Sequence, residues 1–180
     1  WNGTSWTEIA EANTLRYKSA STGSNTAGII AGGEVPPGSA TAVVESWNGS
    51  AWSEISDINS PRMTFAGAGT YTDALVMGGD PNVAKTEYYN GSTWSEQADL
   101  ALGRYINYGS SGSTVAQALV FGGNAPAPLG HRTASTEEWS QPSTFSQQIE
   151  GQLFFNSTAN AFKETINDFA GATWGSGASL

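Results

Sequence analysis

The sequence has no cysteine, and this absence excludes several kinds of chemistry at once. Disulfide bonds, thiol nucleophiles and cysteine-type metal sites are all ruled out. Histidine occurs once, as His131, so neither a Ser-His-Asp arrangement nor a metal site built on several histidines has support. We interpret His131 as a solvated residue in a loop that also contains Pro126 and Pro128.

Charge is also scarce, because charged residues make up only 13% of the chain. The seven basic residues are scattered and the net charge is −9, so the protein cannot neutralise a run of phosphates. We therefore expect no nucleic-acid partner. No stretch approaches the roughly 18 consecutive apolar residues of a membrane-spanning helix, and we expect no membrane insertion.

Glycine and tryptophan are abundant, with 22 and 7 residues among 180. A hydrophobic share of 38% is enough for a folded domain, while many Gly residues beside aromatic residues favour short strands joined by tight turns. Composition therefore predicts an all-β fold.

Four markers recur in the same order and divide the chain into repeats. The segment Trp1–Ile9 returns at residues 47–55 and 89–97, at offsets of 46 and then 42 residues. The other markers are an arginine, a glycine pair, and a glutamate two residues before an aromatic residue. They lie at Arg16, Arg62 and Arg104; at Gly32-Gly33, Gly78-Gly79 and Gly122-Gly123; and at Glu45, Glu87 and Glu137.

Each repeat is predicted to contain four short strands, which the second repeat shows best. They are Met63–Gly69, Ala74–Met77, Thr86–Asn90 and Thr93–Gln97. The last two strands meet at an Asn-Gly turn, where both residue types tolerate a positive φ. The glycine pair should end the second strand where a side chain would clash.

An apolar strand, a glycine pair, an aromatic residue and a later tryptophan together resemble the kelch repeat. The motif residues are Gly32-Gly33 with Trp47 and Trp52, and Gly78-Gly79 with Tyr89 and Trp94. In the third copy Phe145 replaces the last tryptophan, so that copy is degenerate. The resemblance covers residues 1–149 and implies four-stranded antiparallel blades of a β-propeller.

This resemblance sets the expected domain organisation. The kelch-like array would span residues 1–149, with a partial blade at 1–9 and repeats at 16–55, 62–97 and 104–149. Residues 150–180 would form a C-terminal β-hairpin and tail. Two arrangements stay open: the hairpin completes a small four-bladed ring with residues 1–9, or the array is a partial propeller that other residues or another copy complete.

The terminal hairpin carries a second resemblance. Residues 151–163 are predicted to form two strands around a polar Asn-Ser-Thr-Ala-Asn turn. They resemble a hairpin found near the ends of bacteriophage tail fibres and other virion proteins, and the Gly-, Ser- and Thr-rich repeats resemble arrays in phage structural proteins. This resemblance implies a virion or extracellular location and a homo-oligomer.

The repeated carboxylates and tryptophans have a structural explanation that we favour over a catalytic one. A residue that recurs in every repeat is expected to serve the blade structure that all the repeats share. We therefore expect the arginines to form ion pairs with glutamates of two sets, Glu8, Glu54 and Glu96, or Glu45, Glu87 and Glu137. We also expect Trp6, Trp52 and Trp94 to pack between blades.

The sequence thus predicts a non-enzymatic protein with no catalytic, cofactor-binding or metal-binding residues. The favoured function is a virion structural or adhesion component, such as a phage tail fibre, whose partners are other virion proteins, copies of itself, or a host-surface glycan or protein. The alternative is a cellular kelch-type module for protein–protein interaction. A carbohydrate-active enzyme lacks any catalytic set. Recognition is expected in the loops after the glycine pairs, at residues 34–40, 80–85 and 124–134.

Overall fold

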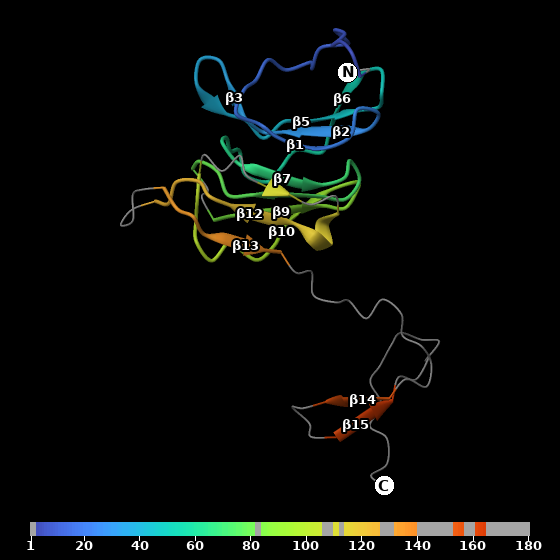
Figure 1. The fold of residues 1–180 in the computed structure, drawn as a ribbon, viewed down its shortest axis with the longest axis vertical. Coiled ribbons are helices and arrows are strands. Elements are labelled where there is room, and N and C mark those ends of the chain that lie inside the picture. The colour runs from blue at the N-terminus through green and yellow to red at the C-terminus, as the bar shows by residue number, and fades with distance from the viewer. Residues whose placement is uncertain are drawn as a thin grey trace. The chain divides into compact units, whose positions relative to one another are not determined.

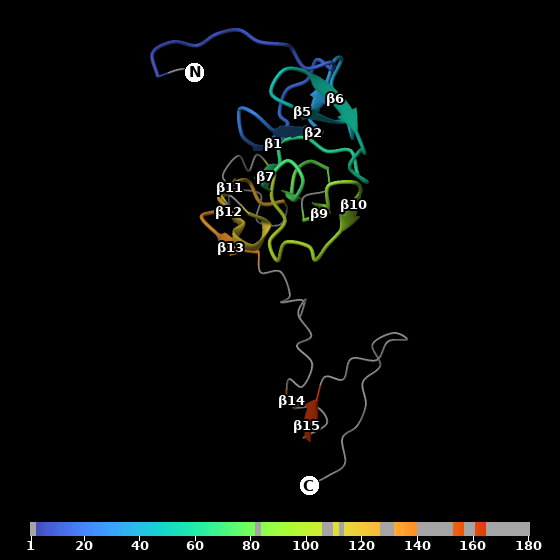
Figure 2. The same ribbon diagram turned by 90° about the vertical axis from the view of Figure 1, so that its right-hand side faces the viewer.

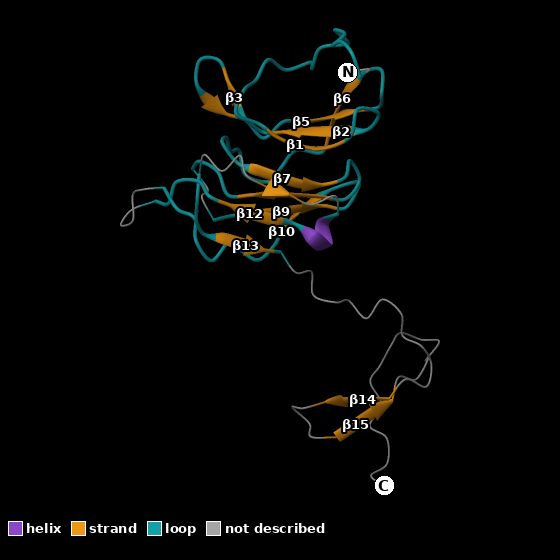
Figure 3. Cartoon of the chain, viewed as in Figure 1, coloured by secondary structure: helices purple, strands orange, loops and turns teal. Residues whose placement is uncertain are grey.

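The computed structural model describes residues 3–81, 84–105, 110–111, 114–126, 132–139, 153–156 and 161–164. The chain divides into two compact units, Trp1–Ser140 and Gln141–Leu180, and each is described by itself. The described part is all-β, as predicted, and its sheets are antiparallel (Figure 3). Its one helical turn is a short 3-10 helix, η1, at Val115–Gln117.

The first repeat forms a four-stranded sheet in which the strands follow each other in chain order. Its strands are β1 (Ala20–Gly23), β2 (Gly28–Ala31), β5 (Val44–Trp47) and β6 (Trp52–Ile55). Between β2 and β5 the chain forms a small separate hairpin of β3 (Glu34–Val35) and β4 (Ser39–Ala40). This hairpin occupies the first of the three loops that the sequence predicts for recognition.

The next two repeats form the second and third sheets. The second sheet contains β7 (Ala66–Gly69), β8 (Ala74–Met77), β9 (Thr86–Tyr89) and β10 (Trp94–Glu96), again in chain order. The third contains β11 (Ser110–Ser111), β12 (Leu119–Phe121) and β13 (Thr136–Glu138). Its predicted fourth strand falls on residues 140–149, which lie outside the described residues.

The predicted strands of the second repeat agree with the structure except at the first one. β8 has the predicted bounds, β9 ends one residue earlier than predicted, and β10 is one residue shorter at each end. The first strand begins at Ala66 rather than Met63, because Met63 forms an isolated bridge with Asp80 and Thr64 has a φ of 55°. A residue with a backbone conformation in the left-handed region cannot continue a β-strand.

Residues 3–9 form no strand, which corrects the prediction of two outer strands there. In the complete repeats the two outer strands pair with two inner strands of the same repeat. Residues 3–9 have no inner strands beside them, and an isolated two-stranded hairpin has little stability in water.

The turns between the two outer strands depend on the asparagine side chain. In the second repeat the Asn90 Oδ1 atom accepts hydrogen bonds from the backbone N–H groups of Ser92 (3.0 Å) and Thr93 (2.9 Å). Gly91 has a φ of 90°, whereas Asn90 is not among the positive-φ residues. The positive φ predicted for both residues is therefore needed only at the glycine, and the asparagine contributes as an acceptor.

The glycine pairs join consecutive repeats. All six of these glycines have positive φ. The N–H of Gly33 donates to the carbonyl of Arg62 in the next repeat at 2.9 Å, and the N–H of Gly79 donates likewise to Arg104. Each of the first two pairs therefore ends a strand and also bonds to the arginine that opens the following repeat.

The second sheet lies between the first and the third (Figures 1 and 2), and its strand β8 is buried along its whole length. Ala74 and Val76 of β8 belong to a core shared with the first sheet, while Leu75 and Met77 belong to a core shared with the third. Strand β1 lies along β7, and β11 also contacts β7. A continuous apolar strand such as β8 fits this position.

In the second unit, β14 (Leu153–Asn156) pairs antiparallel with β15 (Ala161–Glu164). Its register places Leu153 opposite Glu164 and Asn156 opposite Ala161. The predicted C-terminal hairpin is thus confirmed.

The glycine pairs give a direct test of the fold. A Cβ atom at Gly79 would lie 2.6 Å from the Cβ of Phe65 and 2.8 Å from the Met63 carbonyl oxygen, whereas at Gly122 the nearest such atom is 3.9 Å away. Both residues have positive φ. We expect Gly122→Ala to cost about 1 kcal/mol from φ alone, and Gly79→Ala to cost at least twice as much in urea unfolding. Equal losses would contradict this explanation.

Candidate binding site

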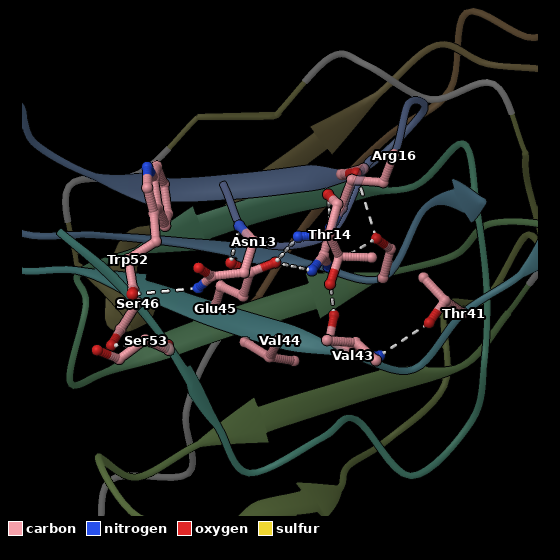
Figure 4. Close-up of polar contacts among 12 residues, drawn as sticks. Asn13, Thr14, Arg16, Thr41, Val43, Val44, Glu45, Ser46, Trp52 and Ser53 are labelled. Atoms are coloured by element: carbon pink, nitrogen blue, oxygen red, sulfur yellow. Dashed lines mark hydrogen bonds and ion pairs between the residues drawn. The ribbon is translucent and has the colours of Figure 1, made fainter. Parts of the chain in front are cut away.

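The arginine of each repeat holds three parts of its sheet together, as Figure 4 shows for Arg16. The guanidinium Nη1 donates to the carbonyl oxygens of Val43 (2.5 Å) and Gly32 (3.2 Å). The Nη2 atom forms an ion pair with Glu45 Oε1. The planar guanidinium thereby ties the glycine pair to the start of β5.

Glu45 connects the same network to the segment that precedes the first sheet. Its carboxylate accepts the backbone N–H of Asn13 at 2.7 Å and that of Thr14 at 3.0 Å (Figure 4). Burial raises the pKa of Glu45, but these two hydrogen bonds and the Arg16 guanidinium outweigh burial, so the pKa lies below its ordinary value. The buried carboxylate is therefore held in its ionised form by the two backbone N–H groups and the guanidinium.

The same network recurs in the second and third repeats. Arg62 bonds the carbonyls of Gly78 and Lys85 and pairs with Glu87. Arg104 bonds the carbonyls of Gly122 and Ser135 and pairs with Glu137. The predicted ion pairs are thus confirmed, and each lies within a single repeat. These carboxylates contribute to the structure of the sheets.

The second set of glutamates does not pair with the arginines. Glu54 is exposed, although its Cα faces that of Glu45 across β5 and β6. Glu96 forms an ion pair with Lys85 at 2.8 Å, and Glu8 is exposed. Since one carboxylate of each facing pair is buried in a guanidinium network, the two-carboxylate arrangement of a glycoside hydrolase has no support here.

The loop after the first glycine pair carries its own polar cluster. Glu34 is buried and accepts hydrogen bonds from the Tyr17 hydroxyl and from Lys18 Nζ, the latter at 2.5 Å. The bonds from Lys18 and Tyr17 lower the pKa of Glu34. In the other two predicted loops, residues 82–83 and 127–131 lie outside the described residues, and the latter range includes His131.

A hollow lined by aromatic side chains lies at the first sheet and is a candidate binding site. Its volume is about 690 Å³. The described residues that line it are Trp6, Thr7, Ile9, Ser21, Thr22, Gly23, Ser24, Asn25, Gly28, Ile29, Trp47, Gly49 and Trp52. We call this hollow the aromatic groove.

The aromatic groove combines aromatic rings with neutral polar groups. The Trp47 and Trp52 rings lie 5.4 Å apart between centroids and are tilted by 42°. The Trp47 Nε1 atom donates to the Asn25 carbonyl at 2.9 Å, which fixes the indole ring. None of the described lining residues is charged. Flat apolar rings beside hydroxyl and amide groups suit a neutral ligand that has both apolar and polar faces.

The equivalent surface of the second repeat is covered. Trp94 is only 7% exposed, and its Nε1 atom donates to the carbonyl of Ser56, which precedes the second sheet, at 2.9 Å. By contrast, Trp52 is half-buried and Trp6 is 82% exposed. The prediction that these tryptophans pack between sheets is therefore right for Trp94 and wrong for Trp6. The repeat pattern alone does not reveal which copy of a shared position is exposed.

The described residues contain no cluster of three or more potential metal ligands. Within the same part of the chain, no helix has the length and apolar character required to cross a bilayer.

Comparison with known proteins identifies a shared fold and no family. No family model matches the chain, and no curated protein does. A solved structure of YjhT aligns with 77% of this chain at 14% sequence identity and a TM-score of 0.65. The alignment covers 47% of YjhT, so this chain spans about half the length of that protein. At this identity the likeness supports the fold alone.

The guanidinium network predicts a large loss when one partner is removed. Arg62→Met leaves the buried Glu87 carboxylate without its counter-charge, and we expect about 3–5 kcal/mol of destabilisation in urea unfolding. Arg132→Met, at an exposed position, serves as the control and should change stability by less than about 0.5 kcal/mol. A loss at Arg62 no larger than the control's would contradict the structural role.

The lowered pKa of Glu45 predicts how its contribution varies with pH. A depressed folded-state pKa adds stability above the ordinary value of 4.5, and this stability is lost as pH falls through the folded-state pKa. We therefore expect wild type to exceed Glu45→Gln in stability at about pH 7, with the difference shrinking towards about pH 3. Urea midpoints of both proteins at the two pH values provide the measurement, and a difference that grows on acidification would contradict the assignment.

Proposed function

We propose that this chain is part of a kelch-like β-propeller array that acts without catalysis, as a virion structural and adhesion component that binds a surface glycan. The aromatic groove is the observation that carries the binding role. The kelch-like repeats supply the rigid framework, and the resemblance of the terminal hairpin to phage fibres supports the virion and extracellular setting.

Three features support the propeller. Each complete repeat is a four-stranded antiparallel sheet in chain order, which is the strand pattern of a blade. Neighbouring sheets share cores, and their inner strands β1, β7 and β11 lie close together. Each of the first two glycine pairs bonds to the next arginine. A chain that continues this stacking adds one blade per repeat.

Glycan binding follows from the chemistry of the aromatic groove. Sugars present apolar C–H faces that stack on indole rings, and hydroxyl groups that exchange hydrogen bonds with Ser, Thr and Asn side chains. Trp6 and Trp52 offer the rings, while Ser21 and Asn25 are among the neutral polar residues. The lack of charge among the described lining residues favours a neutral glycan over a basic or acidic one.

A second copy of the chain is the competing occupant of the aromatic groove. In the second repeat the equivalent tryptophan is covered by the preceding segment, so a sheet or segment of another copy could cover the first in the same way. This occupant corresponds to the predicted self-association and to the protein-interaction alternative. Light scattering across a concentration series distinguishes it, because groove-mediated association would disappear in Trp52→Ala.

The proposed function predicts that the aromatic groove retains polysaccharide. Affinity electrophoresis through neutral bacterial surface polysaccharides should retard the wild-type protein, and Trp6→Ala and Trp52→Ala should each weaken retention about tenfold or more. Tyr71→Ala is the matched control, since Tyr71 is an exposed aromatic residue that does not line the groove.

Two results would overturn this proposal. Glycan binding at the aromatic groove would be ruled out if no polysaccharide retarded the wild-type protein. Equal retardation of the groove variants and the Tyr71→Ala control would also rule it out. Release of new reducing ends from a polysaccharide by purified protein would remove the non-enzymatic assignment. The exposed carboxylates outside the guanidinium networks would then be tested by Glu54→Gln and Glu96→Gln.

A further inference from the structure

A smaller cavity, distinct from the aromatic groove, lies where the second and third sheets meet. Its volume is about 220 Å³. The buried side chains of Met77, Thr86 and Val120 line it, together with the half-buried Trp139. The exposed Asp99 and Glu138 also contribute to its wall. We call it the inter-sheet cavity.

Two polar atoms at this cavity have no protein partner. They are Thr86 Oγ1 and Trp139 Nε1, and they are the two buried side-chain polar atoms without a hydrogen bond among the described residues. Thr86 is only 1% exposed. Native proteins rarely leave such groups unpaired, because burial removes their hydrogen bonds to water. Both residues line the same cavity, so one ligand bound there would account for both unpaired atoms.

The sheet does not require a hydroxyl at Thr86, because the residue before the networked glutamate is Val44 in the first repeat. The third repeat has Thr136 there, but that residue is exposed and its hydroxyl can bond to water. Trp139 occupies the aromatic position that all three repeats share, so its ring serves the fold. Its Nε1 atom has no partner, whereas that of Trp47 donates to the Asn25 carbonyl. The fold therefore accounts for the Trp139 ring but not for its unpaired N–H group or for the buried Thr86 hydroxyl.

The donor and acceptor pattern defines the ligand. An indole N–H only donates, so the ligand must present an acceptor to Trp139. The Asp99 and Glu138 carboxylates disfavour anions and accept hydrogen bonds, so the ligand must also donate. Hydroxyl groups do both. The volume far exceeds the roughly 15 Å³ that a single water needs, and the indole ring offers an apolar face.

We propose that the inter-sheet cavity binds a small neutral polyhydroxylated molecule of about the size of one sugar ring. This inference goes beyond the proposed function and does not depend on it, because the residues of the inter-sheet cavity and of the aromatic groove do not overlap.

The test uses the whole chain and three sugars. D-glucose, D-galactose and D-mannose are titrated separately into wild type, Thr86→Val and Trp139→Phe, with calorimetry and saturation-transfer NMR as readouts. We expect saturable binding of at least one sugar, weakened about tenfold in each variant. Thr86→Val places the residue of the first repeat in the second, so it should remain folded and should not lower the melting temperature.

Two controls separate this cavity from the rest of the molecule. Thr136→Val makes the same chemical change at the equivalent exposed position of the third repeat and should leave sugar affinity unchanged. Trp6→Ala disrupts the aromatic groove and should also leave it unchanged.

Three outcomes would overturn the inference. They are no saturable binding of any of the three sugars, equal affinity in wild type, Thr86→Val and Trp139→Phe, and loss of binding in Trp6→Ala alone. The first would leave bound water as the partner of the two polar atoms, and the last would assign sugar binding to the aromatic groove. Polysaccharide retention that persists in both cavity variants would leave the proposed function standing independently.

Discussion

The buried guanidinium is the interaction on which the rest of this structure depends. In each repeat it satisfies the carbonyl of a glycine pair, a second carbonyl before the third strand and a carboxylate that itself caps two backbone N–H groups. Without it, two carbonyl groups would each lose a hydrogen-bond donor, and the buried carboxylate would lose its counter-charge. A single side chain thereby fixes where the second strand of the sheet ends and where the third begins. Through the carboxylate, it also fixes the position of the segment that precedes the sheet.

The coupling between repeats has a different physical character from the bonding inside them. Within a repeat, charge and side-chain hydrogen bonds predominate. Between repeats, apolar packing predominates, since β8 contributes alternate residues to two separate cores. Gly67 shows how close the sheets come, because a Cβ atom there would lie 3.1 Å from the Ser21 carbonyl oxygen of β1. Small residues on β7 therefore set the distance between the first two sheets.

Much of the fold was predictable from residues that recur. The glycine pairs, the Asn-Gly turns and the Arg–Glu ion pairs all follow from repeat spacing together with the backbone limits of each residue type. The candidate sites were less predictable, because each arises where the repeats differ. Trp6 and Trp94 occupy equivalent sequence positions but have opposite exposure, which depends on what covers each copy. The cavity at Thr86 and Trp139 likewise depends on contacts between sheets, which a single sequence does not show.

The polar link between consecutive repeats is made by backbone groups, and this has a consequence for how such proteins change over evolution. An N–H of a glycine bonding to the carbonyl of an arginine requires no matched side chains on the two repeats. Each guanidinium and its carboxylate lie in one repeat, separated by 29, 25 and 33 residues in the three copies. Loop length is thus free to vary without breaking the network. New loops and new ligand specificities can therefore arise within one repeat, whereas exchange of a whole repeat must also preserve the apolar core that it shares with its neighbour.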